Sequence, residues 1–284
     1  MYLCGINGRH NRPQPERKMK RREFLSTSLT VSALAGISKA SVSLQAAERA
    51  GTNREYYELR VYRLAAGANT EVLDAYLEKA AIPGLNRLGI KPVGVFTEKE
   101  PKGAPAVHVL IPYPNLESFA RASIELNADS DYQKAGSEYL QLPKEKPGFE
   151  RIDSWLMLAF AGMPKLEQPS YSREKKPRIF EIRTYESHSE VKAFKKVEMF
   201  NSGEIDVMRE VGLGPVFYGQ ALVGANLPHL TYMLSAEDQD AHKKHWDAFG
   251  KHPVWNKLKN DQQYADTVSK IKNYFVVPTA YSQI

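Results

Sequence analysis

Two short segments of the chain repeat one pattern of an acid, a base and a phenol at alternate positions. Each contributes three polar residues: Glu58, Arg60 and Tyr62 in the first segment, and Glu181, Arg183 and Tyr185 in the second. In an extended strand, alternate side chains point to the same face, so each segment presents its three groups together. Such an arginine can hold an anion, while the tyrosine or glutamate handles a proton.

A second group of candidate residues lies on a predicted helix toward the end of the chain. His242, His245 and Trp246 share one helix face, because positions three and four apart are neighbours. Histidines at this spacing can bind a transition metal or haem if a third ligand converges. The possible third ligands are His229, His252 and Glu237. No HExxH motif or carboxylate-rich cluster accompanies them, so we predict no metal and no cofactor.

The same histidines allow two other interpretations. His245 could transfer a proton with Tyr218 and Tyr232, which come from adjacent predicted strands, and these three are the candidate catalytic residues. Alternatively, the histidines are structural and only cap the helix or form hydrogen bonds. The predicted ligand-binding set adds three residues to the two strand segments: His229, His242 and Trp246.

The two strand segments belong to a longer internal repeat. An offset of 123 residues aligns Tyr57–Tyr62 with Phe180–Tyr185 and, without a gap, still aligns Tyr132 with Trp255. One register held over this distance indicates a duplicated unit. Each copy has the order strand, helix, strand, strand, helix, strand, which is the ferredoxin-like pattern.

The predicted elements can be placed along both copies. Strands are expected at 56–62, 92–96, 107–111 and 152–160, and again at 180–185, 215–220, 230–234 and 274–277. Asn69 and Asn115 should begin the helices of the first copy, and Ser235 the second helix of the second copy. The predicted domains are a leader (1–47), a first unit (54–162), a proline-containing linker (163–177) and a second unit (178–284).

We therefore predict an α+β fold of two tandem ferredoxin-like domains packed sheet to sheet, with the helices outside. The apolar face of the first strand, with Tyr57, Leu59 and Val61, should meet the helices. The face with Glu58 and Arg60 should then point into the space between the sheets. Two interpretations of that face stay open: a polar ligand cavity, or glutamate–arginine bridges that fix how the sheets dock.

Three motifs stand out within 55–284: the Glu-x-Arg-x-Tyr first strand, the Gly-x-x-Pro turn into the second strand, and Trp246 and Phe249 followed by His252-Pro253-Val254-Trp255. With these motifs, the segment resembles the NIPSNAP family. The family belongs to the dimeric α+β barrel superfamily, so the resemblance implies that the two copies form such a barrel within one chain. It implies no settled activity.

The first 40 residues resemble an export signal. Lys20-Arg21-Arg22-Glu23-Phe24-Leu25 precedes a weakly apolar run that ends at Ile37, which is similar to a twin-arginine signal peptide. The translation start is Met1 or Met19, and the single cysteine, Cys4, leaves with the leader. We expect an exported protein of the periplasm or cell envelope.

The charge of the chain argues against nucleic acid as a partner. The net charge is +6, but the first 40 residues hold eight basic and two acidic residues, which leaves 31 of each sign in the remainder. A surface that binds phosphates needs a local excess of lysine and arginine. The remainder also lacks an apolar segment of about 20 residues, which a membrane span would require.

The sequence thus predicts an exported NIPSNAP-like protein that binds a small ligand or partner in the inter-sheet or sheet–helix cavity. The alternative is an enzyme like other members of the superfamily: a cofactor-independent monooxygenase, an isomerase or a haem-linked protein. We expect a monomer, because a tandem chain supplies its own second copy.

Overall fold

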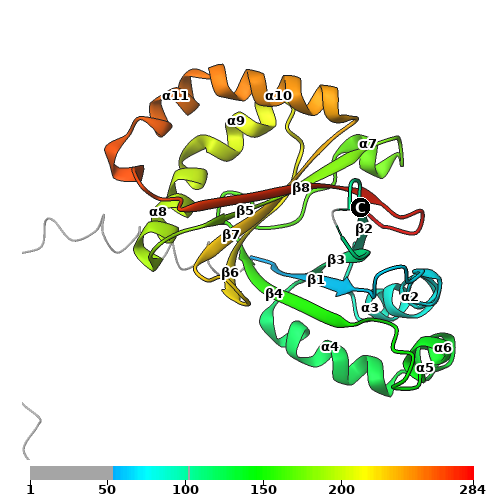
Figure 1. Cartoon of the computed structure of the whole chain (residues 1–284). Coiled ribbons are helices and arrows are strands. Elements are labelled where there is room, and N and C mark those ends of the chain that lie inside the picture. The colour runs from blue at the N-terminus through cyan, green and yellow to red at the C-terminus, as the bar shows by residue number, and fades with distance from the viewer. Residues whose placement is uncertain (1–53, 102) are drawn as a thin grey trace, which may run out of the picture. The chain divides into compact units, whose positions relative to one another are not determined.

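The computed structural model describes residues 54–101 and 103–284 of the chain (Figure 1). The predicted leader, its twin-arginine motif and Cys4 lie outside the described residues. No helix in the described ranges is long and apolar enough to cross a membrane.

The first half has the predicted order of elements. Its strands are β1 (Tyr56–Arg63), β2 (Gly94–Glu98), β3 (Ala106–Tyr113) and β4 (Arg151–Ala159). A first helical segment joins β1 to β2 and consists of α2 (Glu71–Tyr76), the π-helical turn η1 (Leu77–Ala81) and α3 (Ile82–Arg87). A second one joins β3 to β4 and consists of α4 (Leu116–Ala128), α5 (Ser130–Ala135) and α6 (Ser137–Leu140).

The second half repeats this order after a connection that includes the short helix α7 (Ser170–Arg173). Its strands are β5 (Ile179–Glu186), β6 (Pro215–Val223), β7 (His229–Ala236) and β8 (Lys270–Pro278). The first helical segment consists of α8 (Glu190–Met199), the π-helical turn η2 (Phe200–Glu204) and α9 (Ile205–Glu210). The second consists of α10 (Gln239–Lys251), α11 (Pro253–Lys259) and the 3₁₀ turn η3 (Gln262–Tyr264).

The eight strands close into one antiparallel barrel in the order β1-β3-β2-β8-β5-β7-β6-β4. Two pairings join the halves: β2 with β8, through Phe96 and Pro278, and β4 with β6, through Leu158 and Gln220. The edges of each four-stranded half are therefore paired, and the ring has no open edge.

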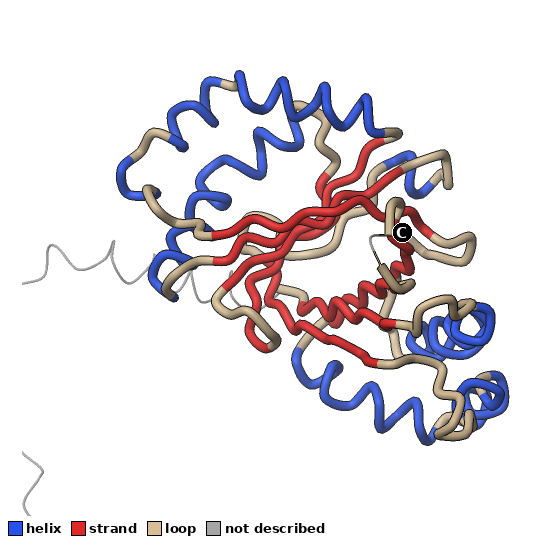
Figure 2. Tube along the Cα trace, in the orientation of Figure 1, coloured by secondary structure: helices blue, strands red, loops and turns tan. Residues whose placement is uncertain are grey.

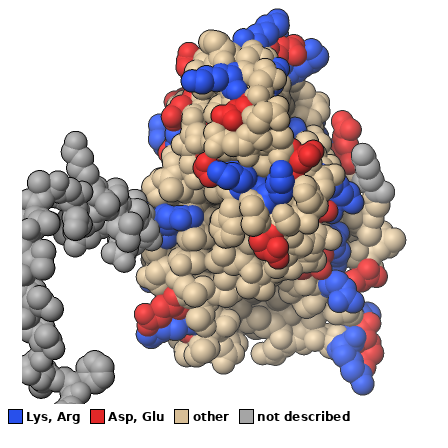
Figure 3. Space-filling view, turned by 90° about the vertical axis from the view of Figure 1, so that its left-hand side faces the viewer, with Lys and Arg blue, Asp and Glu red and all other residues tan. Residues whose placement is uncertain are grey.

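The helices lie outside the barrel in two groups (Figure 2). In Figure 1, α8 to α11 lie over the strands of the second half, while α2 to α6 lie on the side of the first half. On the face drawn in Figure 3, basic and acidic side chains are interspersed. This pattern agrees with the balanced charge of the sequence after its first 40 residues.

The predicted orientation of the first strands is wrong. Tyr57, Leu59 and Val61 point into the barrel, where they form a core with Phe180, Phe217 and other apolar residues. A closed barrel of eight strands has an interior that side chains fill, and an apolar face is the one that can fill it. The opposite face, with the Glu–Arg–Tyr pattern, is covered by the helices instead.

Two of the three predicted helix starts are displaced. Asn115 caps α4 as expected, and its side chain accepts a hydrogen bond from the Ser118 amide. Thr70, not Asn69, precedes α2, and the cap of α10 is Asp238, which accepts from the Ala241 amide. Ser235 is still part of β7, because the strand extends to Ala236 and pairs with β5 over its whole length.

Candidate functional site

The first Glu–Arg–Tyr cluster lies between β1 and the outer helices. The carboxylate of Glu58 accepts two hydrogen bonds from Arg60, from Nε at 2.8 Å and from Nη2 at 3.0 Å. It also accepts one from the Tyr113 hydroxyl at 3.0 Å and one from the Ser154 hydroxyl at 2.8 Å. Glu58 is buried, and its four donors make it a fixed anchor for the guanidinium of Arg60.

Beside this cluster, a cavity of about 480 Å³ opens between the sheet and α4. Arg60 and Tyr113 line it on the sheet side, and Phe119, Ser123 and Leu126 line it on the helix side. The side chain of Arg60 is 32% exposed. Its three hydrogen bonds, to Glu58 twice and to the Tyr62 hydroxyl at 3.4 Å, use three of its five N–H donors, so two are left for a ligand.

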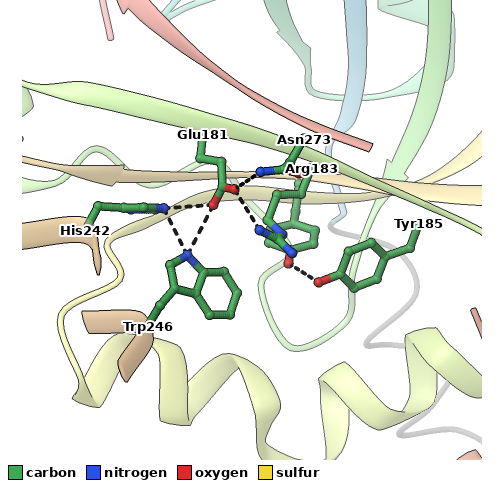
Figure 4. Close-up of polar contacts among 7 residues, drawn as sticks. Glu181, Arg183, Tyr185, His242, Trp246 and Asn273 are labelled. Atoms are coloured by element: carbon green, nitrogen blue, oxygen red, sulfur yellow. Dashed lines mark hydrogen bonds and ion pairs between the residues drawn. The ribbon is translucent and has the colours of Figure 1, made fainter. Parts of the chain in front are cut away.

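The second cluster repeats the pattern but has different neighbours (Figure 4). Glu181 accepts a hydrogen bond from Arg183 Nη1 at 2.7 Å and one from Asn273 Nδ2 at 2.7 Å. His242 Nε2 lies 2.8 Å from Oε2 of Glu181, and Trp246 Nε1 donates to the same oxygen at 3.2 Å. The predicted residues Glu181, Arg183, His242 and Trp246 thus form one network, which Asn273 completes.

The charge of Glu181 is stabilised despite its burial. Burial alone would raise the pKa of this carboxyl, but the hydrogen bond with His242 and the positive charge of Arg183 outweigh it and hold the pKa below its ordinary value. The indole of Trp246 also covers Arg183, with the guanidinium carbon 4.7 Å from the ring centre. Arg183 is consequently only 17% exposed.

A buried ion pair lies next to this network. Lys196 Nζ is 2.8 Å from Glu204 Oε2, and both side chains are almost fully buried. The ammonium also lies 4.6 Å from the ring centre of Phe200 and 5.7 Å from that of Tyr185. Burial raises the pKa of Glu204, although the charge of Lys196 opposes the shift.

The candidate catalytic residues are only partly brought together. The rings of Tyr218 and Tyr232 stack with their centres 5.3 Å apart, and the Tyr232 hydroxyl pairs with that of Tyr185 at 2.7 Å. His245 lies on the outer helix with its ring against Gly212, and among the described residues it forms no hydrogen bond with either phenol. Burial raises the pKa of both tyrosines well above the ordinary value, so neither ionises near neutral pH.

His229 is separate from these clusters. It begins β7 at one end of the barrel and lines a different cavity, together with His108 and Tyr274. The possible metal ligands do not converge either: within the described ranges, no three His, Cys, Asp or Glu side chains could hold an ion.

The partners that complete the two clusters were not among the predicted site residues. Ser154 and Asn273 lie directly opposite Arg60 and Arg183 in the strand pairings, but the chain spacing differs between the copies at this point, so the offset of 123 does not align them. Lys196 carried a usable signal, since it is a charged residue among Ala193, Val197 and Met199 on the buried side of its helix.

The fold and these clusters define a class: an α+β protein whose eight antiparallel strands form a closed barrel, with polar clusters held between barrel and helices. The NIPSNAP family model matches the chain twice, at residues 57–146 and 180–283. The chain therefore belongs to the NIPSNAP family.

One of two similar solved structures has a TM-score above 0.5 and agrees with this fold. A "putative monooxygenase" from Lactobacillus acidophilus NCFM has a TM-score of 0.51 at 8% identity, over 79% of this chain and 94% of that one. An uncharacterised NIPSNAP-like domain protein from Burkholderia xenovorans is 19% identical, over 37% of this chain and 89% of that one, with a TM-score of 0.34. No curated protein matched the chain. At these identities the similarity concerns the fold and not the activity.

Proposed function

We propose that this NIPSNAP protein binds a small aromatic acid in the cavity between the sheet and α4 of the first half. The observation that carries the proposal is the free side of the Arg60 guanidinium, which lines a cavity of about 480 Å³ while Glu58 holds its other side. A carboxylate or sulfonate can accept two parallel hydrogen bonds from such a guanidinium.

The second half supports an aromatic body for this ligand. There the indole of Trp246 covers Arg183, and the offset of 123 places Ser123 at the equivalent position of the first half. The first half therefore has an arginine without its covering ring. A planar ring of the ligand would take that place over Arg60, with Phe119 and Leu126 of α4 as apolar contacts.

A plugging variant tests this proposal. 1-Anilinonaphthalene-8-sulfonate, a fluorescent aromatic sulfonate, should bind the native protein with a stoichiometry of about one, since Trp246 covers the equivalent arginine of the second half. Ser123→Trp introduces the residue that the second half already uses, at an exposed position of α4. It should abolish this binding and leave the thermal unfolding temperature nearly unchanged, because exposed substitutions usually have small effects on stability.

Arg60→Gln serves as the second variant, because it keeps a hydrogen-bond donor for Glu58 but removes the positive charge. It should lower the affinity for the sulfonate by about tenfold or more, whereas the affinity for an uncharged anilinonaphthalene should change little. Equal binding of the sulfonate to native protein, Ser123→Trp and Arg60→Gln would reject the proposal.

The proposal also covers the architecture of the two halves. We propose that each half is a ferredoxin-like unit and that the two form an intrachain counterpart of a dimeric α+β barrel. Support comes from the order of the strands, which is β4-β1-β3-β2 in the first half and β8-β5-β7-β6 in the second. The two orders are the same when β1 to β4 are aligned with β5 to β8. A single half expressed alone should then form a dimer, and an unfolded or purely monomeric half would count against it.

We also propose that the protein is exported, on the strength of the Arg21-Arg22 leader. Cell fractionation should find the native chain in the periplasm, and replacement of both arginines by lysine should retain it in the cytoplasm. A native chain that stays in the cytoplasm would contradict export.

A further inference from the structure

A second cavity, of about 220 Å³, lies at one end of the barrel. Its lining comes from the inward faces of the strands, including Leu59 and Val61 on β1, His108 on β3 and His229 on β7. It is therefore on the other side of β1 from the Arg60 cavity, since Glu58 and Arg60 point outward. Ligands in the two cavities would be separated by the sheet.

Two buried histidines have an unused nitrogen at this cavity. His108 and His229 are each 3% exposed. Within the described part of the chain, neither Nε2 atom has a hydrogen bond of ordinary geometry, although His108 Nε2 lies 3.4 Å from Glu98 Oε1 and the backbone of Ala225 approaches His229. Their Nδ1 atoms have long contacts of 3.4 Å, to the Tyr274 hydroxyl for His108 and to the Thr231 hydroxyl for His229. Buried polar atoms normally have partners, so two such atoms at one cavity indicate a ligand.

The charges at the mouth of the cavity compensate one another. Arg63 pairs with Asp153, and Lys272 pairs with Glu186, so each cation has an anion in contact. Burial also lowers the pKa of His229, which keeps its imidazole neutral near pH 7. An anionic ligand would therefore find no uncompensated cation here.

The remaining walls favour a flat and partly apolar ligand. Trp155 and Tyr274 provide aromatic surface, and the ring of Tyr274 lies 5.2 Å from that of His108. Leu59 and Val61 provide the apolar floor. The volume suits a single ring better than a fused system.

We propose that the barrel end is a second binding site, which takes a small uncharged hydroxylated aromatic compound, of the class of phenol and catechol, between His108 and His229. A hydroxyl group fits either tautomer, because it can donate to a bare Nε2 or accept from a protonated one. The aromatic ring would contact Trp155 and Tyr274.

Ligand-observed NMR on the native chain tests this site with catechol as the probe, and with toluene and benzoate for comparison. Saturation transfer should reach catechol, and its affinity should exceed that of toluene. Ser123→Trp, which closes the Arg60 cavity, should leave catechol binding unchanged. Benzoate should lose its signal in Ser123→Trp, so the failure of one site is distinguishable from the failure of the other.

His229→Phe keeps a ring of similar size but removes the nitrogens. Catechol should bind at least about tenfold more weakly, as expected for loss of a hydrogen bond at a buried site. The unfolding temperature should change little, because the hydrogen bond that is lost, between Nδ1 and the Thr231 hydroxyl, is a long one, whereas a purely structural histidine would cause a clear fall. His188→Phe, at an exposed histidine outside the cavity, is the matched control.

Ala225→Trp provides a variant with little risk to folding. Ala225 lies on the exposed loop between β6 and β7 and lines the mouth of the cavity. Its side chain can close the entrance without altering the core, so catechol binding should be lost. Catechol binding that survives both His229→Phe and Ala225→Trp, or no saturation transfer in the native chain, would overturn the proposed site.

Discussion

The two halves of the barrel share one strand motif but use the space above it differently. In the first half, Arg60 borders an open cavity, and Ser123 is the helix residue above it. In the second half, Trp246 covers Arg183, and His242 contacts Glu181, the carboxylate that pairs with Arg183. A duplicated fold can therefore keep one copy as a filled structural unit and leave the other available for a ligand.

The difference continues deeper into the helix layer. Both halves contain a π-helical turn at the same offset, Leu77–Ala81 and Phe200–Glu204, so the backbone repeats closely. The side chains do not repeat: Leu73 and Ala81 of the first half correspond to Lys196 and Glu204 of the second. The second half thus has an ion pair where the first half has two buried apolar residues.

Removing one member of this ion pair should have the largest effect on stability. Lys196→Leu leaves the Glu204 carboxylate buried without its cation, which should lower the free energy of unfolding by about 3–5 kcal/mol. Chemical denaturation measures the change.

The matched control is the double variant Lys196→Leu with Glu204→Ala, which gives the second half the residues of the first. It should recover a large part of the lost stability, because an apolar pair of similar packing often replaces a buried ion pair without loss. If the double variant is as unstable as the sum of both single variants, the ion pair contributes no coupling and the comparison of the halves is wrong on this point.

The second largest effect on stability should come from Trp246→Ser, which makes the second half resemble the first. Loss of the ring over Arg183 and of the bond to Glu181 should cost about 2–4 kcal/mol in unfolding free energy. The same variant should gain a second site for anilinonaphthalene sulfonate, so titration should show a stoichiometry near two. Trp246→Phe keeps a ring in place and should not gain that site.

Much of the fold could be predicted from the sequence because the repeat is strong. The offset that aligns Glu58 with Glu181 also aligned the first three strands of each copy, and the apolar and aromatic runs near the end of each copy indicated the fourth. The family resemblance is confirmed by the family model, which matches both copies.

The orientation of the strands could not be predicted from the same pattern. Alternation shows that Leu59 and Arg60 lie on opposite faces of β1, but not which face is the barrel interior. Both faces are buried here, one by the barrel core and one by helices, so burial does not distinguish them. The closed ring depends on the pairings of β2 with β8 and β4 with β6, which link residues far apart in the sequence.

Only those residues of the candidate site whose contacts follow from local spacing could be predicted. His242 and Trp246 were found because helical spacing is local, and the structure places both beside Glu181. Asn273 was missed, because its contact with Glu181 depends on the pairing of β5 with β8. A ligand cavity between the sheets or between sheet and helices was among the predictions, but its place beside Arg60 in the first half alone was not, since it depends on small residues such as Ser123.

The smallest of the three effects should appear in the pH dependence of the second half. The pKa of Glu181 is lowered in the folded protein, so its ionised form stabilises the fold above the ordinary pKa of about 4.5. This contribution is lost as the pH falls through the lowered value. The difference in unfolding free energy between the native chain and Glu181→Gln should therefore be greatest near pH 7 and shrink toward pH 3.

The comparison with Glu181→Gln is needed because Glu204 acts in the opposite direction. Its pKa is raised by burial, so its contribution is complete at low pH and is lost as the pH rises through the raised value. The contribution of Glu204 cancels in the difference between the native chain and Glu181→Gln, since Glu204 is present in both proteins. A difference that stays constant from pH 7 to pH 3 would mean that the charge of Glu181 does not hold His242, Trp246 and Arg183 together.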